Sequence, residues 1–208
     1  MRILDLYAGL GGEERRSFIE SRGHEYITLD YAPEFKCNIT KDIFDVTAAS
    51  LGRYDLIWAS PPCECFSVAS ISHHWRKEIG IYIPQTQDAI IAINLVTHTI
   101  KIIKDINPAG WLIENPRGML RKMPFMEEFP RVTVTYCQYG ENRMKPTDLW
   151  GYIPNWTPRK PCNNGDSCHE ASPRGSRTGT QGIKGAARRA VVPLELWKEI
   201  LISMEKTL

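Results

Sequence analysis

A chain of 208 residues that is 42% hydrophobic and 24% charged has the size and composition of one globular domain with a single substantial core. Its formal net charge of +2 identifies no partner, and its longest apolar stretch, residues 89–106, is interrupted by polar side chains and so excludes a membrane span. Because the first residues already read as a strand, we expect no targeting peptide and a cytoplasmic protein whose six cysteines stay reduced.

The first predicted elements surround a glycine-rich turn. Ile3–Tyr7 is a short apolar strand, residues 8–12 contain three glycines, and Glu13–Ser21 has the acidic first turn of a helix. Glycines allow a tight turn and a close approach of the backbone to a ligand. A second strand, Glu25–Leu29, ends at Asp30, whose carboxylate is placed to accept hydrogen bonds from ribose hydroxyls. Each feature alone is more often structural, but together they indicate a nucleoside-containing cofactor.

A rigid turn with a cysteine follows the next predicted strand, Tyr54–Ala59. Pro61 and Pro62 fix the backbone and present Cys63 at a corner, where its thiolate can attack an electron-poor ring carbon. An isolated cysteine is usually a small buried hydrophobe, so its neighbours decide between the two interpretations. His73–Lys77, a basic and aromatic stretch, comes shortly after this turn.

A candidate acid follows the most regular predicted helix, Gln85–Asp105, whose apolar residues recur at helical spacing. The helix leads to a strand, Trp111–Ile113, which ends at Glu114–Pro116. Apolar neighbours would let the carboxyl group of Glu114 keep a proton near neutral pH and act as an acid. Taken alone, a salt-bridged acid is the commoner explanation of such a residue.

The remaining predicted elements complete an α/β fold. Arg131–Cys137 and Pro146–Trp150 look like a terminal antiparallel pair, and Val191–Glu205 is a closing helix with Pro193 in its first turn. Strands that alternate with helices predict a mostly parallel sheet with helices on both faces. Ligands bind such sheets beyond the carboxyl ends of the strands, which is where the candidate residues lie.

The chain between this hairpin and the closing helix is basic. Tyr152–Arg189 carries seven basic and two acidic residues, a net charge of +5, whereas the rest of the chain carries −3. This charge suits a polyanionic partner, although a solvated loop explains it equally well. Within this stretch, Asn155–Gly185 reads as a long loop or a minimal appended module. Cys162, Cys168 and His169 allow a zinc interpretation, but their spacing matches no zinc-finger signature and no fourth ligand is evident, so we expect no metal site.

Three segments resemble, in order, the first, fourth and sixth motifs of the cytosine-5 DNA methyltransferases: residues 5–12, 60–67 and 113–118. The resemblance extends to about Trp150 and resumes near Arg188, and the cysteine of the second segment is typical of enzymes that methylate a ring carbon rather than an exocyclic amine. It implies a Rossmann-like fold that depends on S-adenosylmethionine. The implied division is a catalytic core (1–151), a basic loop or reduced target-recognition region (152–187) and a C-terminal helix that returns to the core (188–208).

The resemblance implies a covalent mechanism on a cytosine flipped out of DNA. Cys63 adds to carbon 6, Glu114 hydrogen-bonds or protonates ring nitrogen 3, and carbon 5 accepts the methyl group. Arg143 lies in a run similar to the family's eighth motif and is expected to contact the base or a phosphate during catalysis. The residues implied to bind the cofactor are Tyr7, Gly9, Gly11, Gly12, Asp30, Tyr31, Asp42, Ile43, Pro62 and Val191.

Four further residues are expected to contact the nucleic acid: Ser67, Asn115, Lys145 and Arg189. Lys145 stands where the family has an arginine and makes a poorer planar contact, so a surface charge pair explains it equally well. Arg189 stands in the last motif region, where it can grip a phosphate. The resemblance also implies that His73–Lys77 belongs to a mobile loop that closes over the flipped base.

The short recognition region leaves alternatives open. It predicts brief or relaxed sequence specificity, a partly single-stranded substrate, or a partner protein that supplies recognition. A transfer-RNA cytosine-5 methyltransferase is the nearest rival, and a catalytically silent cofactor or nucleic-acid binding module is another. Small size suggests a prokaryotic or phage origin. The oligomeric state, the recognition sequence and the role, restriction protection or regulation, stay open.

Overall fold

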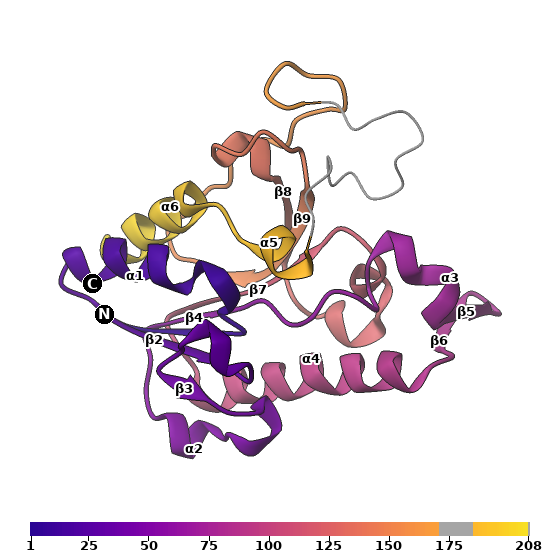
Figure 1. Ribbon diagram of the computed structural model, residues 1–208, viewed down its shortest axis with the longest axis horizontal. Helices are drawn as coiled ribbons and strands as arrows, with labels where there is room; N and C mark the ends of the chain where they lie inside the picture. The colour runs from indigo at the N-terminus through magenta and orange to yellow at the C-terminus, as the bar shows by residue number, and fades with distance from the viewer. Residues whose placement is uncertain (171–184, 208) are drawn as a thin grey trace.

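The computed structural model describes residues 1–170 and 185–207 and has, within them, a seven-stranded sheet of order β3-β2-β1-β4-β7-β9-β8 (Figure 1). β9 runs in the direction opposite to the other six strands of this sheet, and so pairs antiparallel with β7 and β8. The predicted mostly parallel sheet with a terminal antiparallel hairpin is therefore confirmed. The strands are β1 (Arg2–Leu6), β2 (Glu25–Asp30), β3 (Ile39–Thr40), β4 (Leu56–Ala59), β7 (Gly110–Pro116), β8 (Arg131–Thr135) and β9 (Pro146–Tyr152).

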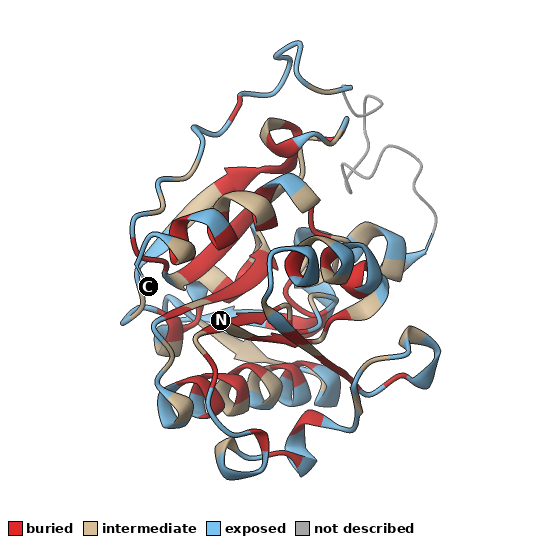
Figure 2. Cartoon of the chain, turned by 90° about the vertical axis from the view of Figure 1, so that its left-hand side faces the viewer, coloured by how far each residue is buried: buried red, intermediate tan, exposed pale blue. Residues whose placement is uncertain are grey.

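Helices cover both faces of this sheet, as the sequence predicts. On one face, α4 packs its apolar side on residues such as Leu4 and Ile57, and on the other α6 packs on Ile3 and Trp58 beside α1 (Figure 1). Each face of the sheet forms its own cluster of buried apolar side chains with the helices that cover it. In Figure 2 the central strands are mostly red, the colour of buried residues. The helices are α1 (Gly12–Ser21), α2 (Ala48–Leu51), α3 (Ile71–His74), α4 (Gln87–Ile106), α5 (Ala186–Ala190) and α6 (Leu194–Glu205).

The strand order places the candidate site. The chain turns from β1 through β2 to β3 on one side of the sheet, and then continues with β4 and β7 on the other. The carboxyl ends of β1 and β4 therefore lie side by side at the point where the strand order reverses, which is where open α/β sheets bind ligands. The glycine turn follows β1, and the cysteine turn follows β4.

Two predicted strand ends are wrong. The strand predicted to stop at Ile113 continues to Pro116, because β9 provides an antiparallel ladder in which Glu114 lies opposite Leu149. The first strand of the hairpin instead stops early, at Thr135, and a 3-10 turn, η7 (Tyr136–Tyr139), follows it. Both shifts reposition residues of the site.

The closing helix begins at Leu194 rather than Val191. Pro193 is its N-cap, with an extended ψ of 134°, and the residue before a proline is disfavoured in helical geometry. The stretch expected as a loop at His73–Lys77 is ordered as the end of α3 and the hairpin of β5 (Trp75–Glu78) and β6 (Ile81–Pro84). Its Trp75 is buried against Phe66, with ring centroids 5.7 Å apart.

The predicted loop Asn155–Gly185 is seen only in part. Up to Glu170 the chain packs on the body, where the backbone N–H of Arg159 donates to Tyr139 Oη at 2.9 Å and that of Cys162 donates to Thr135 Oγ1 at 3.0 Å. Residues 171–184 lie outside the described residues. Over the described ranges, no helix has the length and apolar character needed to cross a membrane.

Candidate active site

The cysteine turn is held from two sides. The carbonyl of Cys63 accepts hydrogen bonds from the backbone N–H of Phe66 at 3.0 Å and of Ser67 at 2.8 Å, which closes a tight turn after the two prolines. The buried side chain of Asn115 donates from Nδ2 to the carbonyl of Pro61 at 3.0 Å. This bond joins the end of β7 to the turn, so that the residues of two motifs are fixed relative to each other.

Glu114 lies buried beside this turn, 4% exposed, and its partners come from the hairpin. The hydroxyl of Tyr136 donates to Oε1 of Glu114 at 2.9 Å, and Lys145 Nζ lies 3.9 Å from the same oxygen. Lys145 is therefore an inward-facing group of the site rather than half of a surface charge pair. The site unites a thiol, a carboxyl group, a phenol and an amine from four segments.

The electrostatics of this cluster act on the thiol. Burial raises the pKa of the Cys63 thiol to about 11, the nearby carboxylates of Glu114 and Glu64 add to the rise, and Lys145 opposes it. Burial likewise lowers the pKa of the Lys145 ammonium, against the attraction of Glu114. The thiol is thus protonated at neutral pH in the free protein, and a positive charge beside it is what favours the nucleophilic thiolate.

The glycine turn forms a second part of the site. Gly9 has φ +54°, a left-handed conformation that favours glycine, and its N–H donates to Asp30 Oδ2 at 3.2 Å. The N–H of Ala32 donates to the other oxygen at 3.1 Å, while burial raises the pKa of Asp30. The two bonds fix this carboxylate at the end of β2, with its remaining lone pairs available to a ligand.

The donor set of this turn fits a nucleoside with a positive charge better than a phosphate. Residues 8–14 contain no basic residue, and Glu13 and Glu14 lie in the first turn of α1. The predicted cofactor residues around it differ in exposure: Tyr31 is 71% exposed, Ile43 is buried, and Asp42 is exposed and caps the N–H of Phe44. An acidic, partly aromatic surface of this kind suits S-adenosylmethionine, which carries a ribose and a sulfonium but no phosphate.

Three other predicted cofactor residues lie close in sequence to the turn. Tyr7 adopts a φ of 62° and its hydroxyl hydrogen-bonds with Thr99 Oγ1 at 2.8 Å, so that its ring is held on α4. Gly11 and Gly12 are buried, and a Cβ at Gly11 would meet the guanidinium of Arg15. The glycines therefore keep room for a buried arginine as well as for a ligand.

A buried ion pair that sequence reasoning missed connects the glycine turn to β1. Arg15 Nη2 lies 2.8 Å from Asp5 Oδ2 and donates to the carbonyl of Ala8 at 2.7 Å, and Tyr26 donates its hydroxyl to the same carboxylate. Burial is the largest influence on Asp5 and raises its pKa, whereas Arg15 lowers it. The signal in the sequence is an acid in an otherwise apolar first strand.

Arg143, predicted as a base or phosphate contact, points into the protein. Its guanidinium pairs with Glu141, donates to the carbonyl of Arg189 at 3.1 Å and reaches that of Val191 at 3.4 Å. It is 3% exposed. In this structure Arg143 holds the segment before α6 onto the hairpin, and a direct contact with substrate stays a prediction.

The other predicted residues are only partly brought together. Ser67 is half-buried and caps a short turn through the N–H of Ala69, and Pro62 is exposed at the cysteine corner. Arg189 and Val191 are half-buried in the connection before α6. Sequence reasoning missed Tyr136, which the resemblance does not mark. β8 ends at Thr135, and Tyr136, the first residue of the turn that follows, reaches Glu114.

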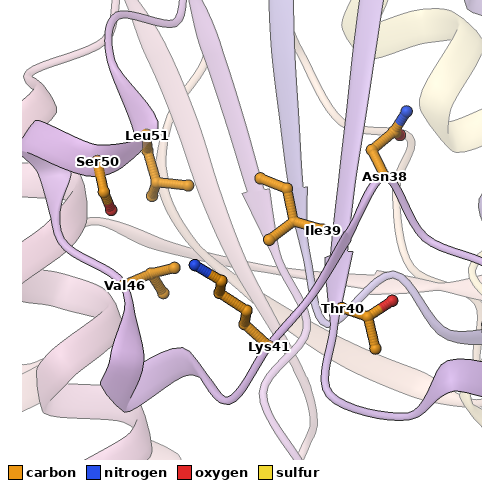
Figure 3. A pocket seen from close by; sticks show the side chains of 7 residues that line it. All are labelled: Asn38, Ile39, Thr40, Lys41, Val46, Ser50 and Leu51. Carbon is orange, nitrogen blue, oxygen red and sulfur yellow. The ribbon is translucent and has the colours of Figure 1, made fainter.

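A hollow of about 340 Å³ lies elsewhere, between β3 and α2 (Figure 3). Its walls include Ile39, Val46 and Leu51, with Lys41 pointing into the same space. It contains none of the predicted site residues, and we assign it no part in the site.

Comparison with known proteins gives consistent matches. A family model described as C-5 cytosine-specific DNA methylase matches residues 1–133. The chain is 29% identical over 202 residues to a probable DNA (cytosine-5)-methyltransferase of Frog virus 3 (isolate Goorha), which covers 91% of this chain and 92% of that protein. It is 33% identical over 130 residues to the type II methyltransferase M.FnuDI of Fusobacterium nucleatum, covering 59% of this chain and 34% of the relative. The match thus spans about a third of the bacterial enzyme but nearly all of the viral one.

Proposed function

Because the chain belongs to the C-5 cytosine-specific DNA methylase family, it transfers a methyl group from S-adenosylmethionine to carbon 5 of cytosine in DNA, and we propose that Cys63 is the nucleophile. The observation that carries this proposal is the placement of Cys63 on a turn locked to β7 by Asn115, beside the buried carboxyl group of Glu114. A nucleophile and an acid are held there, the first on the turn after β4 and the second on the adjacent strand β7.

The proposed reaction begins when the Cys63 thiol loses its proton to water, beside the charge of Lys145, and the thiolate forms a bond to carbon 6 of the cytosine. The electron pair displaced from the ring moves toward nitrogen 3, where Glu114 hydrogen-bonds or delivers a proton. Carbon 5 becomes nucleophilic, and bound S-adenosylmethionine would supply the methyl group, with the electron pair of the broken sulfur–methyl bond left on S-adenosylhomocysteine. Loss of the carbon-5 proton to a base, with return of the nitrogen-3 proton to Glu114, then lets the bond between sulfur and carbon 6 break, which restores the aromatic ring and the thiolate.

The neighbours of these two residues have proposed roles as well. Lys145 favours the thiolate by its charge, and Tyr136 orients the carboxyl group of Glu114. Asn115 Oδ1 is buried without a hydrogen-bond partner among the described residues, which leaves it available to accept a hydrogen bond from the exocyclic amine of the base. Arg143 is a positioning residue that acts through the segment it holds.

The proposed cofactor pocket lies between the turns that follow β1 and β2. Asp30 would accept hydrogen bonds from the ribose hydroxyls, Tyr31 and Ile43 would flank the adenine, and Asp42 would lie near its amine. Gly9, Gly11 and Gly12 would let the backbone approach the ligand, beside Tyr7, Pro62 and Val191. Support comes from the fixed carboxylate of Asp30 and from the lack of basic residues in the glycine turn.

The target base has to leave the duplex to reach a half-buried thiol. We propose that the β5–β6 hairpin, whose Arg76 and Lys77 are exposed, lies against the DNA on one side of the site. Residues 152–187 form a reduced recognition region between the core (1–151) and the returning helix (188–208). So short a region predicts contacts with few base pairs, and Ser67 and Arg189 would contact the backbone.

Trapping with DNA that contains 5-fluorocytosine tests the proposal. A base can remove hydrogen from carbon 5 as a proton but cannot remove fluorine as a cation. The adduct with Cys63 therefore persists once the methyl group has been transferred, and it survives denaturing electrophoresis. Wild-type protein and Cys65→Ser, a change to a buried thiol two residues away, should form the adduct, whereas Cys63→Ser should not. Adduct formed by Cys63→Ser would refute the role of this thiol.

A parallel arm distinguishes the nucleic acids. Single-stranded DNA, duplex DNA and transfer RNA are each incubated with the protein and radiolabelled S-adenosylmethionine. The family predicts label in DNA. Label in RNA alone would establish the rival substrate, and cofactor binding without label or adduct would identify a silent binding module.

A further inference from the structure

Three cysteines and a histidine from distant parts of the chain meet at one point outside the proposed active site. Cys137 belongs to η7, Cys162 and Cys168 to the segment after β9, and His169 follows directly. Their ligand atoms, one from each residue, all lie within 4.8 Å of one another. The sequence spacing hides the cluster, because Cys137 is 25 residues before the next member.

The distances fit the edges of a tetrahedron around one metal ion. Zn²⁺ bonds of about 2.3 Å to sulfur and 2.0 Å to nitrogen require separations of roughly 3.5–3.8 Å between ligand atoms. Cys168 Sγ lies 3.7 Å from Cys137 Sγ and 3.5 Å from His169 Nδ1, and Cys162 Sγ lies 3.6 Å from the same nitrogen. The Cys137–Cys162 pair is closer, at 3.0 Å, so this edge has to open on binding.

The surroundings are those of a built site. A turn in which the N–H of Asn163 donates to Asp166 Oδ2 at 2.7 Å brings the loop back between Cys162 and Cys168. Gln138 Nε2 lies 3.4 Å from Cys168 Sγ, where it can donate to a thiolate. Outer hydrogen bonds of this kind orient metal ligands and stabilise their charge. Cys137 and Cys162 are buried, which shields the centre from solvent.

We propose that Cys137, Cys162, Cys168 and His169 bind one structural Zn²⁺ ion. Three thiolates and one imidazole make a closed coordination shell with no open position for a substrate, and each thiol releases its proton on binding. The expectation that this region holds no metal is thereby replaced. The missing fourth ligand is Cys137, which sequence reasoning placed at the end of a strand.

The proposed ion fastens the start of the recognition region to the catalytic core. Cys137 follows Tyr136, which holds Glu114, so the metal lies one residue from a group of the active site. Past the cluster, the N–H of Glu170 donates to the carbonyl of Asn142 at 2.8 Å, next to Arg143. A short segment has no hydrophobic core of its own to stabilise its conformation. A metal cross-link supplies that stability instead.

Metal analysis of the intact protein tests the proposal. Protein purified without chelator should contain about one equivalent of zinc per chain, and Cys168→Ser and His169→Ala should lose most of it. Cys37→Ser and Cys65→Ser, which remove thiols outside the cluster, should keep it. Cys168 is exposed, so its replacement leaves the protein folded even where changes to the buried members do not.

Cobalt provides a readout that does not depend on activity. Reduced, metal-free wild-type protein should take up one Co²⁺ and show the visible bands of a tetrahedral complex together with thiolate charge-transfer bands. Absence of metal as purified together with no cobalt spectrum after reduction would overturn the proposal. So would a Cys137–Cys162 disulfide in the isolated protein that, once reduced, takes up no metal. Trapping by 5-fluorocytosine DNA reports on Cys63 independently, so failure of one proposal leaves the other standing.

Discussion

The phenol of Tyr136 and the carboxyl group of Glu114 are joined by a buried hydrogen bond of 2.9 Å, across the intervening strand β9. Burial and the charge of Glu114 raise the pKa of Tyr136 well above its usual value, so the hydroxyl keeps its proton and acts as a donor. Tyr136 thus fixes the orientation of the group proposed to act on ring nitrogen 3.

Replacement of Tyr136 by phenylalanine should lower kcat by about tenfold to a hundredfold, the cost of losing a hydrogen bond to a charged group of roughly 1.5–3 kcal/mol. KM for DNA should change little, because the hydroxyl touches the acid and not the duplex. Steady-state methylation assays measure both. Tyr139→Phe is the control: its hydroxyl accepts from Arg159 and does not reach Glu114, so kcat should stay near wild type. Equal kcat values for the two variants would contradict the orienting role.

Alkylation of Cys63 by iodoacetamide should rise with pH and reach half its maximum near pH 11, because the reactive form is the thiolate and the thiol pKa is about 11. Lys145→Met removes the charge that favours the thiolate, so the rate at pH 8 should fall by roughly threefold to tenfold. Peptide mapping by mass spectrometry separates Cys63 from the other cysteines. Lys101→Met, which removes an exposed lysine of α4 that pairs with Asp105 outside the proposed site, serves as control. A faster reaction in Lys145→Met would be the opposite of the expected sign.

Gly118→Ala should both destabilise the protein and slow catalysis. A Cβ at this position would overlap the carbonyl oxygen of Phe66, which accepts from Met119 N–H at 2.7 Å directly after the cysteine turn. Overpacking of this kind costs about 1–3 kcal/mol, measured by urea unfolding. Gly110→Ala, at the start of β7, would place its Cβ against the flexible side chain of Met204 and should lose stability without a loss of kcat. Catalytic loss in both variants alike would show a general effect of folding.

Glu205 should make stability depend on acid pH. The hydrogen bond from Arg22 is the main cause that lowers its pKa from 4.5 to about 2, burial opposes it, and His24 helps. A carboxyl group with a lowered folded-state pKa stabilises fully above pH 4.5 and loses that contribution as the pH falls toward 2. Glu205→Gln should lower Tm at pH 7 by about 2 °C, and less at pH 3. Glu195→Gln, an exposed acid of the same helix, should leave Tm nearly unchanged at both values.

Much of the fold was predictable because its signals are local. The apolar period of α4, the glycines after β1 and the two prolines before Cys63 each specify their own conformation. The alternation of elements then predicts the parallel sheet. The strand ends were not predictable in this way, because β7 continues to Pro116 only where β9 pairs with it.

The site was predictable to the extent that residue type alone carries chemistry. Cys63 and Glu114 stand out by resemblance, and the structure places both beside Lys145. Tyr136 and Cys137 do not stand out, because their partners lie on other strands or 25 residues away. Arg143 was predicted from the resemblance as a base or phosphate contact, and its burial against Glu141 depends on contacts that the sequence does not reveal.

Arg143, which donates to the carbonyls of Arg189 and Val191, and the backbone bond between Asn142 and Glu170 attach both flanks of residues 171–184 to one short stretch of the hairpin. We therefore expect changes of sequence or length between these flanks to leave the positions of the Cys63 thiol and the Glu114 carboxyl group unchanged. Because residues 152–187 are the proposed recognition region, segments grafted between residues 170 and 185 should alter the sequence preference while methyl transfer is retained.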